Sequence, residues 1–158
     1  MSNQYWGKKD LSLLRKAKNL RDLVKIAEHV LIKMPNPRAQ LCGPISTGGM
    51  GSVEVNIKNL QKSIKILELK GINIFDHLKF EPILDKLSVN WEQSGFYPDV
   101  PILEDFYGKI FEMGLLDVIY FLPNWSTSFG ARWEYDYANK LGIKTFILPN
   151  NWEENFIP

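Results

Sequence analysis

The stretch DVIYFLPNWSTSFGARWEYDYANKLGIKTFIL, residues 117–148, decides the fold of this chain. Two short apolar segments, within 117–123 and 144–149, lie on either side of a segment with helical periodicity, 128–142. Neither apolar segment alternates cleanly between apolar and polar residues, which is typical of strands that are covered on both faces. A strand, a helix and a second strand in this order predict a parallel pair joined by a crossover.

The earlier part of the chain has the same order of elements. Residues 40–43 (QLCG) and 72–75 (INIF) are candidate strands, separated by a glycine-rich loop at 43–52 and by an amphipathic helix that stops at Gly71. The helix is indicated by apolar residues that recur at steps of four and three: Val53, Ile57, Leu60, Ile64 and Leu67.

The middle of the chain is less regular. We expect residues 76–98 to be irregular, with a short helix around 83–87, and residues 100–114 to form a helix before the strand at 117–123. With right-handed crossovers, these elements predict an α/β three-layer sandwich. Its parallel, doubly wound sheet would have about four to five strands and be flavodoxin-like or half-Rossmann-like.

The N-terminal segment is predicted to be one extra helix. Asp10 can cap a helix that runs to about Met34 and ends before Pro35 and Pro37. We therefore divide the chain into a helical extension, residues 1–37, and an α/β domain, residues 38–158. The extension is expected to pack across the sheet or against another subunit.

Composition and charge exclude several classes of protein. The 158 residues have a formal net charge of +1, which argues against a nucleic-acid partner. The single Cys42 fits a reducing compartment, and with only His29 and His77 we expect no metal site and no cofactor. No signal peptide or membrane span is recognisable. These features predict a cytoplasmic single-domain protein that does not contact a membrane.

Two unusual loops are expected to meet at one edge of the sheet. Ligands of such sheets bind outside the carboxyl ends of the strands, where GPISTGG (43–49) and NWSTSFGARWE (124–134) both fall. The first loop joins a strand to a helix N-terminus, which favours an anion. Its glycine spacing matches neither a Walker loop nor a dinucleotide fingerprint. Ligand contact and a simple tight turn therefore remain alternatives.

Glu134 is the unusual residue of the predicted helix at 128–142. It lies on the same stripe as Ala131 and Ala138, which should face the core. The carboxylate could point sideways into solvent, form a buried ion pair with Arg132 or Lys140, or line a cleft as a catalytic group. In the third case, the helix dipole would keep it ionised and able to act as a nucleophile.

A nucleophilic carboxylate at an acetal carbon needs a second acid or base. The candidates, each of which could instead be a cap or a solvated side chain, are Glu104, Asp105, Asp117 and Asp99. The surrounding aromatic residues could stack on a nucleobase or simply pack together; they are Trp125, Phe129, Trp133 and Tyr135.

These motifs together resemble the nucleoside 2-deoxyribosyltransferase-like superfamily. The resemblance covers residues 39–148. It is carried by two motifs, LCGPISTGG (41–49) and LPNWSTSFGARWE (122–134), the second of which is followed by Ala138 and by LG at 141–142. The superfamily includes deoxyribosyltransferases, 2′-deoxynucleoside 5′-phosphate N-hydrolases and an uncharacterised bacterial and phage branch, to which this chain is most similar. Where the phosphohydrolases have an arginine in the first loop, this chain has Ser46 or Thr47, which puts a monophosphate preference in doubt.

The resemblance implies roles for particular residues. Glu134, flanked by Gly130 and Ala138, falls on the family nucleophile, which attacks C1′ of a (deoxy)ribosyl group and expels the base. Asp105 matches a family aspartate if its helix is one turn longer. Arg132 could pair with Glu134 or bind a substrate anion. The full set of implied substrate-binding residues is Gly43, Ile45, Ser46, Thr47, Gly48, Gly49, Trp125, Ser128 (across a subunit interface), Gly130 and Arg132.

Three functional hypotheses follow. The first is cleavage or transfer at the N-glycosidic bond of a (deoxy)nucleoside or nucleotide through a covalent glycosyl-Glu134 intermediate. The alternative is a non-catalytic module that binds a nucleotide-like ligand in the same cleft. A structural or assembly role of the leading helix is the third. The expected partners are a small-molecule nucleoside or nucleotide and further copies of the chain, as a dimer or larger homo-oligomer.

Overall fold

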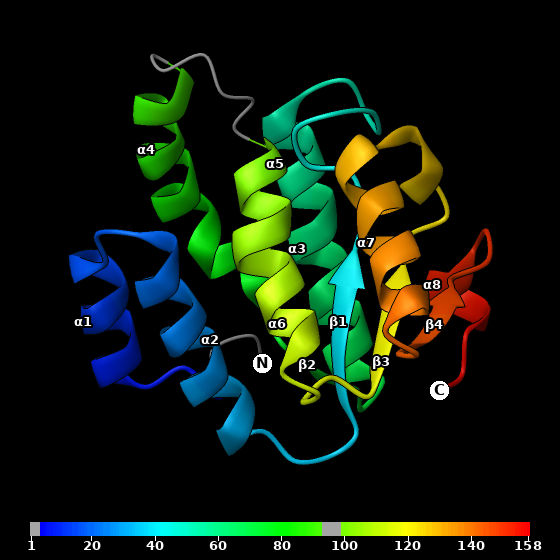
Figure 1. Ribbon diagram of the computed structural model, residues 1–158. Helices are drawn as coiled ribbons and strands as arrows, with labels where there is room; N and C mark the ends of the chain where they lie inside the picture. The colour runs from blue at the N-terminus through cyan, green and yellow to red at the C-terminus, as the bar shows by residue number, and fades with distance from the viewer. Residues whose placement is uncertain (1–3, 93–98) are drawn as a thin grey trace.

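A computed structural model describes residues 4–92 and 99–158 (Figure 1). Its centre is a parallel sheet in the order β2-β1-β3-β4. The strands are β1 (Arg38–Cys42), β2 (Asn73–Ile74), β3 (Val118–Phe121) and β4 (Lys144–Ile147). The predicted α/β class, the parallel sheet and the strand number are thereby confirmed.

The strand order creates a switch point between β1 and β3. From β1 the chain crosses to β2 on one side and then returns to β3 and β4 on the other. Cys42 pairs with Phe121, and Phe121 pairs with Ile147, so the carboxyl ends of these three strands lie side by side. Ligands of doubly wound sheets bind at such a point.

Helices cover both faces of the sheet (Figure 1). On one face, α3 (Val53–Leu69) and the short α8 (Trp152–Asn155) pack on Ala39 and Leu41. On the other face, α7 (Phe129–Lys140) and the helical segment 99–112 share a core with Cys42 and Phe121. Neighbouring residues of β1 thus face opposite layers, as the alternation of a strand requires.

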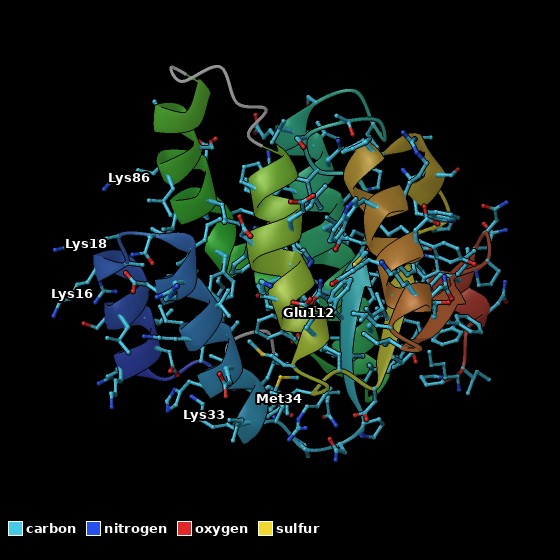
Figure 2. All side chains as sticks on the ribbon, in the orientation of Figure 1. Lys16, Lys18, Lys33, Met34, Lys86 and Glu112 are labelled. Carbon is cyan, nitrogen blue, oxygen red and sulfur yellow. The ribbon has the colours of Figure 1, made fainter. Side chains whose placement is uncertain are left out.

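The predicted N-terminal helix is two helices, so the single helix expected from Asp10 to Met34 is wrong. α1 (Lys8–Lys16) and α2 (Leu20–Lys33) are separated by a turn at residues 17–19; Lys16 at the end of α1 and Lys18 in the turn point outward (Figure 2). The Asn19 side chain accepts from the Asp22 N–H and thereby starts a new helix. The apolar periodicity continues through this cap and did not reveal it.

Asp10 also has a different role from the expected helix cap. It lies in the first turn of α1, is 1% exposed, and binds Lys33, His29 and the Gly7 N–H. Burial raises the pKa of this carboxyl, but the hydrogen bonds lower the pKa by a larger amount. The net pKa of Asp10 is therefore below its ordinary value. The pair of Asp10 and Lys33 therefore ties α1 to the end of α2.

α2 is part of the main hydrophobic core. Its fully buried residues share one cluster with Phe106 and Ile110 of segment 99–112; they are Leu23, Ala27, Val30 and Leu31. The extension thus packs on the helical layer of the α/β domain. The division of the chain into a helical extension, residues 1–37, and an α/β domain, residues 38–158, stays a prediction.

The segment expected to be irregular is largely helical. A 3₁₀ turn η1 (His77–Phe80) leads directly into α4 (Glu81–Glu92). Pro82 is tolerated in the first turn of α4 because the N–H groups there have no acceptor within the helix. The helix expected around 83–87 is confirmed but is longer, the expectation of irregular structure is wrong for residues 77–92, and residues 93–98 lie outside the described part of the chain.

The helix expected at 100–114 is confirmed, but it contains a wide turn. α5 (Asp99–Ile102) runs into a π-helical turn η2 (Leu103–Tyr107) and then into α6 (Gly108–Glu112). The Gly108 N–H donates to the carbonyl of Leu103, five residues back. Such turns insert one extra residue and occur frequently at functional sites.

Candidate active site

A cavity of about 220 Å³ lies at the carboxyl ends of β1 and β3. The loop after β1, α4, η2 and the first turns of α7 form its walls. Of the residues predicted for the site, it brings together Gly43, Ile45, Ser46, Ser128, Gly130 and Glu134. The two unusual loops therefore converge, as their positions after neighbouring strands predicted.

Glu134 lines this cavity and is only 7% exposed. The Cys42 thiol at the end of β1 donates to Glu134 Oε2 over 3.0 Å, and Gln40 Nε2 donates to Cys42 Sγ over 3.6 Å. Of the three alternatives for Glu134, the structure shows the carboxylate in the cleft. Arg132 is exposed and donates to the Ser126 carbonyl over 2.7 Å, so the structure does not show the alternative of an ion pair between Arg132 and Glu134.

Burial controls the charge of Glu134. Desolvation raises its pKa from an ordinary 4.5 to about 7, the Cys42 hydrogen bond opposes this rise, and the charge of Glu81 adds to it. The expectation that the helix dipole keeps Glu134 fully ionised is wrong. Glu134 is the sixth residue of α7, beyond the first turn in which the dipole is felt.

A second carboxylate lines the same cavity, and sequence reasoning missed it. Glu81 is the first residue of α4, and the Tyr107 hydroxyl binds its Oε1 over 2.8 Å. The same hydroxyl lies 3.0 Å from His77 Nδ1, while His77 Nε2 lies 2.9 Å from the Leu41 carbonyl oxygen. A polar chain therefore runs from the sheet to the cavity wall.

The inner members of this chain are deeply buried. His77 is 2% exposed and Tyr107 is 4% exposed. Burial lowers the pKa of His77, which favours the neutral ring, and raises the pKa of Tyr107 well above its ordinary range. The pKa of the buried Cys42 thiol is also raised, first by burial and then by the Glu134 charge. Glu134, with a pKa of about 7, is therefore the group of this site that can exchange a proton near neutral pH.

The structure does not bring Asp105 to the cavity. Asp105 is exposed and lines a separate surface hollow together with Glu104 and Trp133. Asp117 accepts the Arg38 N–H over 2.7 Å at the opposite end of β1. The side chain of Asp99 lies outside the described residues. Of the expected acid partners whose side chains the structure describes, Glu104, Asp105 and Asp117, none lines the cavity of Glu134.

The glycine-rich loop is held by internal hydrogen bonds. The Gly49 N–H donates to Thr127 Oγ1, and the Met50 N–H donates to Asn56 Oδ1. Asn56 Nδ2 donates in turn to the carbonyls of Ile45 and Gly48. Because the N–H groups of Gly49 and Met50 have protein acceptors, the tight-turn alternative describes residues 49 and 50.

Thr47, Gly48 and Gly49 lie beside the cavity and do not line it. Thr47 Oγ1 accepts the N–H of Phe129 over 3.0 Å, so it holds the start of α7. Gly48 and Gly49 line a more open hollow that shares Ser46 and Val53 with the cavity. A ligand too large for the cavity could extend in this direction.

Ser128 and Gly130 form the wall next to Glu134. Ser128 is buried, and its hydroxyl accepts the Ala131 N–H as the cap of α7. Its predicted role across a subunit interface stays a prediction.

The aromatic residues mainly pack against one another. Trp125 lies 4.5 Å from Tyr135 and 5.7 Å from Phe121 between ring centroids, and Trp133 stacks on Tyr137. Trp125 is not among the residues that line the cavity. The packing alternative therefore describes Trp125 and Trp133 in this structure.

Comparisons with known proteins give one partial match. Residues 106–147 match the model of a family described as a domain of unknown function, DUF4406. The match covers about a quarter of the chain and includes β3, α7 and Glu134. No curated protein and no solved structure matches the chain.

Among the described residues 4–92 and 99–158, no three His, Cys, Asp or Glu side chains are grouped in a way that could hold a metal ion. No helix in this part of the chain has the length and apolar character needed to cross a membrane.

Proposed function

We propose that the protein cleaves or transfers at the N-glycosidic bond of a (deoxy)nucleoside or nucleotide. The observation that carries the proposal is the presence of two carboxyl groups, Glu134 and Glu81, in one cavity at the switch point of the sheet. A retaining glycosyl transfer needs one carboxylate as nucleophile and a second group as acid and base. The resemblance of residues 39–148 to nucleoside deoxyribosyltransferases supports the same chemistry.

Glu134 is the nucleophile in this proposal. Its carboxylate attacks C1′, the bond from C1′ to the base nitrogen breaks, and a glycosyl ester forms on Glu134. Water or a second base then takes the sugar from the ester. Because the pKa of Glu134 is about 7, roughly half of the molecules carry the reactive carboxylate at neutral pH. The Cys42 thiol orients the carboxylate from the sheet side.

The size of the cavity favours a small ligand. At about 220 Å³ it is smaller than the roughly 300–1,000 Å³ of common ligand pockets. In the proposed complex it holds the sugar next to Glu134, and the rest of the ligand lies in the hollow beyond Ser46 and Val53. The internal bonding of the Gly49 and Met50 N–H groups supports a hydroxyl or base rather than a phosphate at this loop.

A substrate panel tests the proposal. Purine and pyrimidine ribonucleosides, deoxynucleosides and their 5′-monophosphates are incubated with the protein, with and without an acceptor base, and free base is measured by chromatography. We expect base release by the wild type and none by Glu134→Gln. Glu54→Gln, in which an exposed carboxylate is removed, is the matched control and should retain full activity. Absence of base release from every substrate would refute the proposal.

A non-catalytic binding module is the second candidate. It is favoured by the raised pKa of Glu134, because a carboxyl that is half protonated can both donate to and accept from the edge of a nucleobase. In this case a nucleoside or nucleotide raises the melting temperature with its concentration but is recovered intact. A flat response to the whole panel would contradict both candidates.

The predicted homo-oligomer and the cytoplasmic location stay predictions. The edge strand β4 supports an oligomer, since Phe146 and Ile147 are 38% and 42% exposed there. Size-exclusion chromatography with light scattering gives the subunit number directly, and a monomer at micromolar concentration would contradict the prediction.

A further inference from the structure

The cavity that holds Glu134 is lined by acidic side chains and not by basic ones. Glu134, Glu81 and Asp85 all line it, whereas none of its lining residues in the described part of the chain is Lys, Arg or His. Residues 90–100 (NWEQSGFYPDV), which include the internal segment that the structure does not describe, contain no basic residue either. Lys86, the neighbour of Asp85 in sequence, points away from the body of the molecule (Figure 2). The cavity therefore carries an excess of negative charge.

One face of α4 brings two of these carboxyl groups to the cavity. The α4 residues that line it are spaced as neighbours on one side of a helix, and they are Glu81, Leu84, Asp85 and Ser88. Asp85 is exposed, whereas Glu134 on the opposite wall is only 7% exposed. The carboxyl groups therefore extend from the buried end of the cavity to its open end.

The charges in this cavity are not compensated by basic side chains. Glu134 Oε2 accepts from the Cys42 thiol, but Glu134 Oε1 has no hydrogen-bond partner in the described part of the chain. In the same part of the chain, neither Glu134 nor Asp85 forms a salt bridge. The charge of Glu81 helps to raise the pKa of Glu134, so these two groups interact within the cavity. Because the described side chains are not grouped in a way that could hold a metal ion, an organic cation is the ligand that would compensate them.

We propose that the substrate is a nucleoside whose base carries a permanent positive charge on the ring that forms the glycosidic bond, such as a pyridinium or an N-alkylated purine. This proposal rests on the proposed function and narrows its substrate class. In the complex, the sugar lies next to Glu134 and the cationic ring lies among the three carboxyl groups of the cavity. The same charges attract a cation and repel an anion, and they act at short range in a partly buried site.

A permanent charge on the base also changes the proton balance of the reaction. A neutral base leaves as an anion unless an acid protonates it, whereas a cationic base leaves as a neutral molecule. A Glu134 oxygen forms a bond to C1′, the bond from C1′ to the ring nitrogen breaks, and its electron pair neutralises the ring. One carboxylate and one cation thus become a neutral ester and a neutral base, and Glu81 gives up no proton. Water then attacks C1′, the ester bond to Glu134 breaks, and a proton of the water passes to solvent.

A binding experiment tests the charge preference without turnover. The probes are 1-methylnicotinamide, which is a cation, and its 1,4-dihydro form, which is neutral and has nearly the same shape. Neither probe has a glycosidic bond, so neither can be cleaved. In NMR titrations of the wild type at low salt, we expect a Kd at least about tenfold lower for the cation, and a smaller preference in about 0.5 M salt. Equal binding of both probes, or binding of neither at millimolar concentration, would overturn the proposal.

Two matched variants locate the preference in the cavity. Asp85→Asn removes one charge from the open end of the cavity, and because Asp85 is exposed, the fold should tolerate the change. We expect this variant to reduce the preference for the cationic probe by about two- to fivefold at low salt. Asp105→Asn removes the same charge from a separate surface hollow and should leave the preference unchanged. Equal effects of the two substitutions would contradict binding of the cation in the cavity.

Base release separates this inference from the proposed function. N-ribosylnicotinamide, a pyridinium nucleoside, is compared with inosine, whose base is neutral and needs a proton to leave.

We expect kcat/KM to be at least about a hundredfold higher for the pyridinium nucleoside, since proton transfer to a neutral base is worth about 10²–10⁴-fold. Asp85→Asn should lower the ratio of the two kcat/KM values by about two- to fivefold, and Asp105→Asn should not change it. If neither nucleoside releases its base, the proposed function fails, while the titrations still decide whether the cavity prefers a cation. If inosine is cleaved as fast as the pyridinium nucleoside, the proposed function stands and the cationic substrate class fails.

Discussion

Removing the charge of Glu134 should make the protein more stable, and only above acidic pH. The pKa of this carboxyl rises from 4.5 in an exposed setting to about 7 in the folded chain. At about 1.36 kcal/mol per pH unit, this difference corresponds to about 3 kcal/mol. Below pH 4.5 the carboxyl is protonated in both the folded and the unfolded chain, so its full contribution to stability is present. As the pH rises through about 7, this contribution is lost.

The variant Glu134→Gln has no such loss, since the amide has the shape of the protonated carboxyl and cannot ionise. We compare the variant with the wild type at two pH values. The difference in free energy of unfolding between them should be about 3 kcal/mol more in favour of the variant at pH 8 than at pH 4.5. For a chain of this size, that corresponds to a gain of roughly 6–12 °C in melting temperature. The group is 7% exposed, so solvent screening does not reduce the effect appreciably.

Urea unfolding at several pH values between 4.5 and 8 measures this difference directly. Glu54→Gln is the control, because Glu54 is 77% exposed and paired with Lys58 on the surface of α3. Its stability should stay within about 0.5 kcal/mol of the wild type at every pH. A Glu134→Gln difference that is constant with pH, or that grows as the pH falls, would refute the assignment of a buried, ionisable Glu134.

Three further predictions concern the loop, the second carboxylate and the thiol. Gly48→Ala should destabilise the fold by about 2 kcal/mol more than Gly114→Ala in denaturant unfolding. Both glycines have a positive φ, at +66° and +71°, but only at Gly48 would the new Cβ meet a backbone oxygen, that of Thr127, at 2.0 Å. Equal losses of stability would contradict the close approach of the loops that contain Gly48 and Thr127. Asp105→Asn should leave base release unchanged while Glu81→Gln reduces it at least a hundredfold, and the opposite result would restore Asp105 as the acid. Cys42→Ala should move the acid limb of the activity profile to higher pH by roughly half to one pH unit, because the thiol hydrogen bond lowers the pKa of Glu134, whereas Cys42→Ser retains a donor and should move it less.

The sheet could be predicted from sequence because its strands carry a strong local signal. Short apolar segments at 117–123 and 144–149, separated by a helix, leave few arrangements other than a parallel pair. The same kind of signal failed at the N-terminus, where the apolar stripe continues through the cap at Asn19. It also failed at α4, whose Glu81 and Pro82 are normal residues of a first helical turn but resemble loop residues in isolation.

Glu134 could be found from sequence because a carboxylate on a stripe that should be buried contradicts the pattern around it. Glu81 shows no such contradiction, since an acidic residue is ordinary at the start of a helix. His77 and Tyr107 are single polar residues in apolar sequence surroundings. The same pattern is equally typical of side chains that only fill the core. Their connection depends on contacts across 26 and 30 residues, which no local pattern reports.

The wide turn at Leu103–Tyr107 contains both the exposed Asp105 and the buried Tyr107. Asp105 would keep its face toward Glu134 only if the helix were longer by a whole turn. A π-helical turn adds a single residue, and one residue rotates the helix by about 100°. The rotation leaves Asp105 on the surface and places the hydroxyl of Tyr107 in the cavity wall. That hydroxyl cannot serve as an acid at neutral pH, because its pKa is raised well above 10. It can, however, bind a carboxyl from another element, and α4 supplies Glu81. In the proposed function, Glu81 is therefore the second carboxyl group that the cavity offers beside Glu134.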